Sequence, residues 1–419
     1  MIALPHYHFG TMETQLQYHL PIGMHLLPPS LLDLRPTSEI DNDLLHPAAV
    51  ASEKNIWFFW DTGFQRMPAH NQRNIRTWHR RLSKLGWTIR VVDKLPGSPL
   101  NISNFLDIHD PHTFPSCFTQ GTITGAFSAQ HTSDLVRFPL LLRYGGVYAD
   151  AGMMQIGDLD RLWNQTIGNP DSPYEVLSYD GNDPQQRTLC NYFLASNRDN
   201  PLFARCHRLF LALWEGKTST HGLHAHPLLK GVGMMGQSLS FVEDGIEYGP
   251  DQTSKMLTDY IIQGQVMTMV MGLVDKEDSW NGPAYAANHV YVIEFMVGAQ
   301  LINQFTAWDG RRAFELMSLH LPTNGEPEND DQGLAREIVE TCLGKSFGFK
   351  LATGIIVRIM GDTLGSFWKK NIGSDDVQGT YAHWLRYGML YWNQDEVPPP
   401  VMFNRVFEPI KEGSLLKEN

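Results

Sequence analysis

The sequence predicts an α/β fold in which a sheet of parallel strands is followed by a mostly helical C-terminal region. Two observations predict the sheet: short apolar runs alternate with an amphipathic helical pattern, and turn residues or glycines bound these elements. A third observation predicts the helical region. After about residue 250, apolar residues recur at helical spacing in longer segments that are rich in Met and aromatic side chains.

The first strand-helix-strand unit lies between residues 56 and 93. Residues 56–60 (IWFFW) form an apolar run followed by Asp-Thr-Gly, which is typical of a buried strand that ends in a turn. Residues 71–85 carry apolar side chains three and four apart, and Gly86 ends this predicted helix. Residues 87–93 are rich in β-branched side chains and read as the second strand. A unit of this size predicts two parallel strands.

A second helix and a third strand follow. Thr132 or Ser133 can cap a helix that ends at the glycine pair 145–146, where positive φ angles suit a C-terminal cap. Residues 147–150 then form a short strand with Asp150 at its carboxyl end. Ligands of open α/β sheets bind beyond the carboxyl ends of the strands, so Asp150 is placed for chemistry rather than for packing.

These patterns divide the chain into four segments. Residues 1–53 are rich in Pro, His and Leu without sustained periodicity, which predicts an extended arm over the core or a partly mobile lid. Residues 54–250 form the predicted α/β core, and residues 251–397 form the mostly helical region. Residues 398–419 open with three prolines and are predicted to be a tail of low structural content.

Composition narrows the class of protein. Lys and Arg number 33 against 45 Asp and Glu, a formal net charge of −12, and there is no basic run of the kind that binds nucleic acid. The four cysteines include no close pair, which argues against a zinc site and a disulfide framework. The first residues lack the pattern of a secretory leader, and no apolar stretch is long enough to span a membrane. We therefore expect a cytoplasmic protein without a transmembrane segment.

Two neighbouring motifs carry a family resemblance. They are SDLVR at residues 133–137 and YGGVYAD at residues 144–150. Together they resemble the core of glycosyltransferase family 32, a block also found in capsule-polysaccharide-synthesis-like enzymes and in the large clostridial glucosylating toxins. The resemblance extends over residues 54–215. It implies a GT-A (Rossmann-like) core that binds a nucleotide sugar, with residues 251–397 as the acceptor region.

The resemblance implies three catalytic residues. Asp134 and Arg137 lie three apart on a helix and so face the same way, and in the family these positions hold the donor sugar. Asp150 matches the first Asp of the family's Asp-x-Asp motif. That motif binds Mn²⁺ or Mg²⁺, which bridges the donor diphosphate and stabilises the charge on the departing nucleotide.

Further donor contacts follow from the same resemblance. Trp60 matches the residue that stacks on the nucleotide base, with Trp57 as the second choice. Tyr148 lies one strand period before Asp150 and faces the same side of the sheet. Asn191 resembles an Asn that contacts the donor sugar.

The family also supplies a metal ligand or a phosphate contact from near its C-terminus. His383 and Trp384, within residues 379–386, are the best match in this chain. The predicted metal ligands are therefore Asp150 and His383.

One position departs from the family pattern, because the second Asp of Asp-x-Asp is Gly152 here. Three alternatives follow: a metal held by Asp150 and a C-terminal residue, transfer without a metal, or a catalytically inactive relative that binds or scaffolds.

Simpler explanations exist for several of these residues. A helical Asp-x-x-Arg pair is usually a surface ion pair worth about 0.3–0.5 kcal/mol, and Trp57 and Trp60 could both be core residues. The run GVGMMG at residues 231–236 fits a dinucleotide fingerprint, but no strand precedes it, so an oxidoreductase is not expected. His221, His224 and His226 lack a nearby carboxylate or Cys partner for a metal.

The sequence thus predicts a glycosyltransferase that moves a hexose from a nucleotide sugar, with UDP favoured, to a hydroxyl acceptor. A small molecule, a lipid or a glycan are the acceptor classes, and the Met- and aromatic-rich second half favours an apolar one. A catalytically inactive binding protein on the same fold is the alternative.

Overall fold

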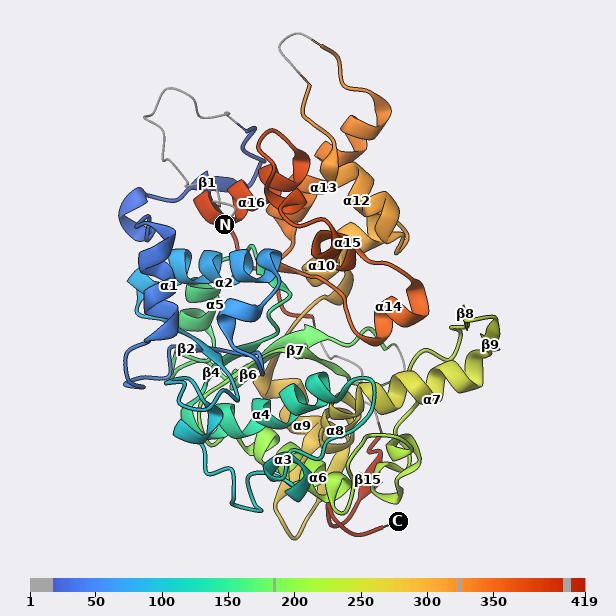
Figure 1. The fold of residues 1–419 in the computed structure, drawn as a ribbon. Helices are drawn as coiled ribbons and strands as arrows, with labels where there is room; N and C mark the ends of the chain where they lie inside the picture. Colours follow the sequence, from blue (N-terminus) through green and yellow to red (C-terminus); the bar gives the residue numbers. More distant parts are fainter. Residues whose placement is uncertain (1–17, 184–185, 323–325, 402–407, 419) are drawn as a thin grey trace.

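A computed structural model describes residues 18–183, 186–322, 326–401 and 408–418. Its centre is a six-stranded sheet with the strand order β12-β6-β7-β4-β2-β3 (Figure 1). The strands of this sheet are β2 (Asn55–Phe59), β3 (Thr88–Val92), β4 (Gly146–Ala149), β6 (Val176–Asp180), β7 (Leu189–Ser196) and β12 (Val290–Ile293).

The sheet is mixed, which corrects the prediction of a parallel sheet. Strand β7 runs antiparallel to both of its neighbours, β4 and β6, while the remaining neighbours pair in parallel. The reason is the connection, because residues 181–188 are too few for the crossover that a parallel strand needs. The predicted unit of β2, a helix and β3 is confirmed as two adjacent parallel strands.

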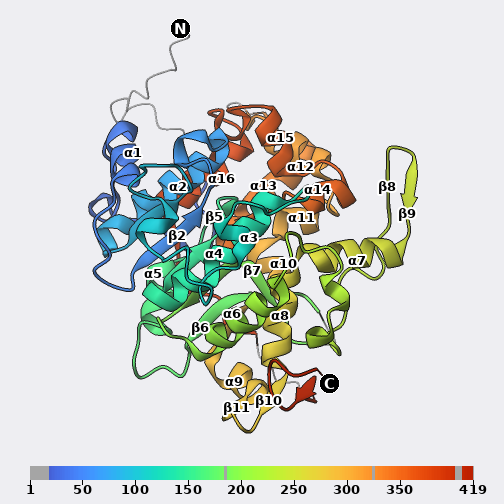
Figure 2. The same cartoon turned by 60° about the horizontal axis from the view of Figure 1, so that its bottom comes forward.

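Helices cover both faces of the sheet, and the alternation of strand side chains assigns them. In β2, Ile56 and Phe58 face one core, whereas Trp57 and Phe59 face the other. The first core is closed by α1 (Thr37–Leu45), α2 (Ala69–Leu82) and α5 (Leu159–Gln165). The second core is closed by α4 (Ser128–Tyr144), α6 (Pro201–Trp214) and α8 (Ile262–Met271), which Figure 2 shows on the face brought forward.

Local sequence explains where these helices begin and end. Helix α2 begins after Pro68, buries Ile75 and Trp78, and the chain turns at Gly86 with φ +89°. Helix α6 begins at Pro201 and is capped by Asn200, whose side chain accepts from two backbone N–H groups. Helix α4 begins at Ser128, which corrects the predicted cap at Thr132: its hydroxyl donates to the Ser128 carbonyl instead.

The glycine pair between α4 and β4 is required by close packing. Gly146 has φ +96°, and a Cβ there would lie 2.3 Å from the Asn55 carbonyl oxygen. Gly145 has φ +64°, and its carbonyl accepts the Trp57 indole N–H at 3.0 Å. These contacts hold β4 against the start of β2 and so fix the position of Asp150.

The C-terminal half forms a third core, seen at the top of Figure 1. Its helices are α11 (Leu301–Phe305), α12 (Gly310–Ser318), α13 (Asp330–Lys345), α15 (Leu364–Lys370) and α16 (Tyr381–Tyr391). Helix α13 carries a capping box between Asn329 and Gln332. Strand β13 (Gly348–Lys350) pairs antiparallel with β5 (Met153–Gln155), directly after the Asp150 turn.

Elements of the structure depart from the predicted content of the segments at three places. The segment 1–53 contains helix α1 and β1 (Met24–Leu26), which pairs with β14 (Trp392–Gln394); residues 1–17 of the predicted arm lie outside the described residues. Strand β12 lies inside the segment 251–397 yet belongs to the central sheet. In the tail, β15 (Lys411–Glu412) pairs with β10 (Leu273–Asp275).

The remaining elements surround this frame. They are α3 (Ser116–Thr119), β8 (Phe241–Glu243), β9 (Ile246–Tyr248), α7 (Pro250–Tyr260), β11 (Trp280–Asn281), α9 (Gly282–His289), α10 (Phe295–Ala299) and α14 (Ile355–Met360). The β8–β9 hairpin projects from the body beside α7 (Figures 1 and 2). Across the described ranges, no helix combines the length and the apolar character that crossing a membrane requires.

Candidate active site

The candidate site lies where the carboxyl end of β4 meets the amino end of β7. Asp150 follows β4, and its backbone N–H donates to the Tyr192 carbonyl at 2.9 Å. Helix α4 runs alongside and supplies Asp134 and Arg137, both about 4% exposed. The structure therefore brings the three predicted catalytic residues together.

Arg137 is the centre of this cluster. Its Nη2 donates to Asp150 Oδ1 at 3.0 Å, and its Nη1 lies 2.9 Å from Asp134 Oδ1. Nη1 also donates to the Asn191 carbonyl at 2.8 Å and to Gln263 Oε1 at 3.1 Å. Burial by itself lowers the pKa of Arg137, but the charges of Asp150 and Asp134 outweigh it and raise that pKa above its ordinary value. The guanidinium is thus a fixed cation.

Asp134 is held from three sides. The Asn191 side-chain amide donates to Oδ1 at 3.2 Å, and the His131 Nδ1 atom lies 3.3 Å from Oδ2. The Gln263 amide donates to the Asp134 carbonyl at 2.8 Å, so Gln263 bridges α8 to α4. Asn191 therefore lies in the cluster, with its amide directed at Asp134.

Asp150 is more open than its neighbours, with a side chain 25% exposed. Its Oδ2 accepts from Lys350 Nζ at 2.6 Å. Burial by itself raises the pKa of Asp150, but Lys350 and Arg137 outweigh it and hold that pKa below its ordinary value. Asp150 is thus a carboxylate with a cation on each oxygen.

Two tyrosines line the cluster. Tyr148 faces the same side as Asp150, its ring lies under the Arg137 guanidinium, and its hydroxyl is 2.7 Å from Ser133 Oγ. Burial raises the pKa of Tyr148 to about 12, so the hydroxyl stays neutral. Burial also raises the pKa of Tyr260, at the end of α7, and the charges of Asp134 and Asp150 raise it further. The cluster is therefore enclosed by α4, α7, α8 and the sheet.

The two tryptophans occupy different environments. Trp57 is fully buried in mid-strand, and its ring packs against Phe105 and Tyr144. No face of Trp57 is left for a nucleotide base, which favours the packing role. Trp60 follows the carboxyl end of β2 and is half-buried. Of the two residues, only Trp60 has the exposure that base stacking needs.

The structure does not join His383 to the cluster. His383 lies on α16 and its Nδ1 is hydrogen-bonded to the Tyr18 hydroxyl. Burial lowers the pKa of His383, which favours the neutral ring. Trp384 is 1% exposed, stacks on Tyr18 and belongs to the third core. Their environment is that of core residues.

Sequence reasoning missed four residues that complete the cluster. They are His131, Tyr260, Gln263 and Lys350. His131 precedes Asp134 by three positions, a helical spacing that offered a signal. The others come from distant segments, and the signals available were the two glutamines, Gln263 and Gln265, in the otherwise mostly apolar α8 and the single Lys of β13.

The residues around Asp150 do not fit the divalent cation that the resemblance implies. Position 152 carries no side chain, and within the described residues the Asp150 carboxylate pairs with Arg137 and Lys350 rather than with His383. An ion would need two or more oxygen ligands and would face two cations.

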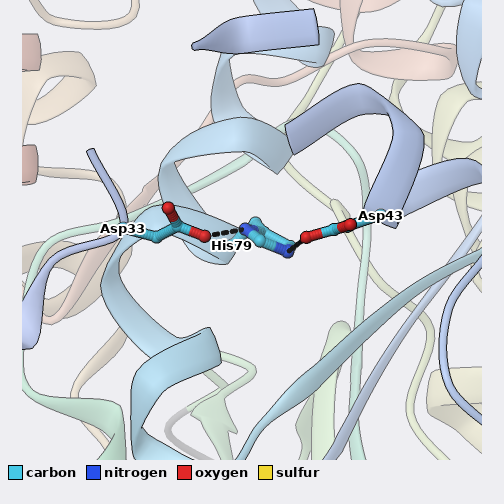
Figure 3. Close-up of side chains that lie close together, drawn as sticks. All are labelled: Asp33, Asp43 and His79. Carbon is cyan, nitrogen blue, oxygen red and sulfur yellow. Dashed lines mark ion pairs between the residues drawn. The ribbon is translucent and has the colours of Figure 1, made fainter. Parts of the chain in front are cut away.

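Figure 3 shows a second group of metal-type side chains: Asp33, which precedes α1, Asp43 on α1 and His79 on α2. The two carboxylates face opposite ring nitrogens, each at 3.8 Å. Arg35 Nη2 already contacts both, at 2.6 Å from Asp33 and 2.5 Å from Asp43. This is an ion-pair network that fastens α1 to α2, not a metal site.

Comparisons with known proteins place the chain in a family. Residues 37–222 match the family model described as capsular polysaccharide synthesis protein. The O-glycosyltransferase braB of Annulohypoxylon truncatum is 32% identical over 405 residues, 95% of this chain and 94% of the relative. The glycosyltransferase afumC of Aspergillus fumigatus is 32% identical over 381 residues, which are 90% of this chain and 93% of the relative.

A third relative extends the pattern. The O-glycosyltransferase PaGT of Phomopsis amygdali is 30% identical over 398 residues, 93% of this chain and 95% of the relative. The segment matched by the family model includes Asp134, Arg137, Asp150 and Asn191, whereas Lys350 lies beyond it.

Proposed function

The chain belongs to the glycosyltransferases, and we propose that it transfers a hexose from a nucleotide sugar to a hydroxyl group, with a UDP-sugar as the favoured donor. One observation carries the proposal: Arg137 is locked between Asp134 and Asp150 at the carboxyl end of β4. This edge of an open sheet is where such folds bind their ligands. We take the core to be of the GT-A type, supported by this placement.

The proposed roles follow from exposure and charge. The partly exposed Asp150 edge, with Lys350 and Arg137 behind it, receives the diphosphate, because cations there offset its charge. Asp134 and the Asn191 amide orient the hexose through its hydroxyl groups. Trp60, half-buried after β2, stacks on the base. In this arrangement the protein positions the donor, and the acceptor oxygen attacks the anomeric carbon.

The acceptor is proposed to be a hydroxyl, which the word O-glycosyltransferase in two relatives' names supports. The apolar acceptor cleft is less well supported. Trp368, Trp384 and Trp392 are at most 2% exposed and form the third core. The acceptor panel should therefore include hydrophobic small molecules, lipids and glycans alike.

The test is calorimetric titration of UDP-glucose, UDP-galactose, UDP-N-acetylglucosamine and GDP-mannose, each in Mn²⁺ and in EDTA. We expect one donor to bind with micromolar affinity and to bind at least tenfold more weakly to Asp150→Ala. Asp251→Ala is the matched control, because Asp251 is an exposed residue on α7. Failure of all four donors to bind under both conditions would remove the proposed function.

A further inference from the structure

We propose that Lys350 takes the place of a divalent cation in this protein and supplies the positive charge that the donor diphosphate needs. The inference rests on the proposed function, and it makes Lys350 a donor-binding residue. The segment that carries Lys350 lies outside the family-model match, and its position next to Asp150 is set by the tertiary fold.

The first argument is the occupancy of Asp150. Lys350 Nζ lies 2.6 Å from Oδ2 and Arg137 Nη2 lies 3.0 Å from Oδ1. Both carboxylate oxygens therefore have a cationic partner, and a divalent ion could bind Asp150 only by displacing one. At close range two like charges repel strongly in a partly buried site.

The second argument is the space at Gly152. A Cβ at this position would lie 3.6 Å from Lys350 Nζ and 3.0 Å from the Leu351 carbonyl oxygen. The missing second carboxylate of the motif would thus project beside the Lys350 ammonium. In this protein, Gly152 and Lys350 stand where the family pattern has an aspartate and a divalent metal ion.

The third argument is the balance of charge. An aspartate plus a divalent cation contributes −1 and +2, a sum of +1. Glycine plus lysine contributes 0 and +1, the same sum. With Asp134, Arg137 and Asp150 unchanged, both arrangements give the donor-free site the same net charge, so the diphosphate meets the same total charge in either.

The fourth argument is that Lys350 is positioned in advance. Strand β13 pairs with β5 so that Lys350 lies opposite Met153, and the Leu351 N–H donates to the Gly152 carbonyl at 3.0 Å. The ammonium lies 5.6 Å from the Tyr192 ring centroid and its side chain is 13% exposed. Asp150 accepts from one of its three N–H groups, which leaves two for phosphate oxygens.

The chemistry is balanced without a further reactant. The bond between the anomeric carbon and the phosphate oxygen breaks, and its electron pair stays on the diphosphate. Lys350 stabilises that charge without forming a covalent bond. The acceptor oxygen bonds to the anomeric carbon, and its proton leaves with the diphosphate.

The experiment is titration of UDP and GDP, in EDTA and in Mn²⁺, on the wild type, Lys350→Met and Lys350→Arg. We expect the better nucleotide to bind the wild type in EDTA, with an affinity that Mn²⁺ changes less than twofold. Lys350→Met should bind at least tenfold more weakly in EDTA, and Lys350→Arg should retain most of the affinity. Lys345→Met, an exposed lysine at the end of α13, is the matched control.

A double variant keeps the test decisive if Lys350→Met loses stability. Lys350→Met with Gly152→Asp restores the family's two carboxylates, so its nucleotide binding should become dependent on Mn²⁺. Thermal melting in the absence of nucleotide shows which variants are folded.

The outcomes separate the inference from the function. Binding that requires Mn²⁺ in the wild type and ignores Lys350→Met overturns the inference and leaves the glycosyltransferase proposal intact. Absence of UDP and GDP binding to every protein in both conditions overturns the proposed function, and the inference with it.

Discussion

Arg137 Nη2 donates to Asp150 Oδ1 at 3.0 Å, which ties helix α4 to the loop that leaves β4. The same guanidinium contacts Asp134, so one cation bridges two carboxylates, of which only Asp150 has a second cationic partner, Lys350.

Replacing Arg137 by Lys is therefore expected to disable the site although the charge is kept. A single ammonium cannot reach Asp134 and Asp150 as the planar guanidinium does. Nucleotide affinity should fall at least tenfold, and the melting temperature should fall as well, because a buried carboxylate loses its partner. Titration and melting on Arg137→Lys measure both. Wild-type affinity in the variant would show that the cluster is structural only.

The two tryptophans should separate into a binding residue and a core residue. Trp60→Ala removes the proposed stacking face and is expected to weaken nucleotide binding by about 1–3 kcal/mol with little change in stability. Trp57→Ala empties a fully buried position and should lower the free energy of unfolding by about 3–5 kcal/mol. Urea titration and calorimetry on both variants decide the assignment. Reversed effects would place the base beside Trp57.

His383 is expected to stabilise the fold through its hydrogen bond to Tyr18 and not to contact the donor. His383→Ala should change the affinity for UDP less than twofold, in Mn²⁺ and in EDTA. The stability changes of His383→Ala and Tyr18→Phe should be non-additive, because the two side chains share one hydrogen bond. A tenfold loss of Mn²⁺-dependent affinity in His383→Ala would instead establish the metal or phosphate contact that the sequence predicts.

Gly146→Ala tests whether backbone packing sets the position of Asp150. The added Cβ would lie 2.3 Å from the Asn55 carbonyl oxygen, so we expect a loss of about 3 kcal/mol or more in unfolding free energy. Gly97→Ala is the matched control, because Gly97 also has positive φ, +76°, but open space around it; about 1 kcal/mol is expected there. Equal effects in the two variants would show that φ alone explains the glycine.

Asp375 should connect stability to pH. It is fully buried between Arg386 and Arg73, which join α16 to α2. Burial by itself raises the pKa of Asp375, but the two arginines outweigh it and hold that pKa below its ordinary 3.8. The stabilisation is thus complete above that ordinary value and is lost as the pH falls below it.

Asp375→Asn is accordingly expected to lower the free energy of unfolding by about 3 kcal/mol at pH 7, with a difference from wild type that shrinks toward pH 3. Nucleotide affinity at pH 7 should stay within twofold. Asp251→Asn, in an exposed pair with Lys255, is the control and should change stability by less than about 1 kcal/mol. A pH-independent difference would contradict the ion-pair account.

Local patterns predicted much of the frame. Strands β2, β3 and β4 and helix α2 lie where periodicity and glycine stops placed them. The start of α4 and the helix in residues 37–45 were not predicted. Neither helix has an N-terminal side-chain cap that could be recognised in the sequence. Strand β12 was missed because only its pairing with β6 makes it part of the sheet.

The candidate site likewise combines residues that the sequence predicts with residues that only the tertiary fold brings together. By itself, the sequence predicted one candidate site with Asp134, Arg137 and Asp150, because the motifs that carry them resemble the family's and belong to one local helix-turn-strand unit. Only the tertiary structure decided that Lys350, 200 positions later, contacts Asp150, and that His383 pairs with Tyr18 instead. The pairing of β13 with β5 fixes that contact, and such long-range pairing depends on the packing of the whole core, which no local periodicity encodes.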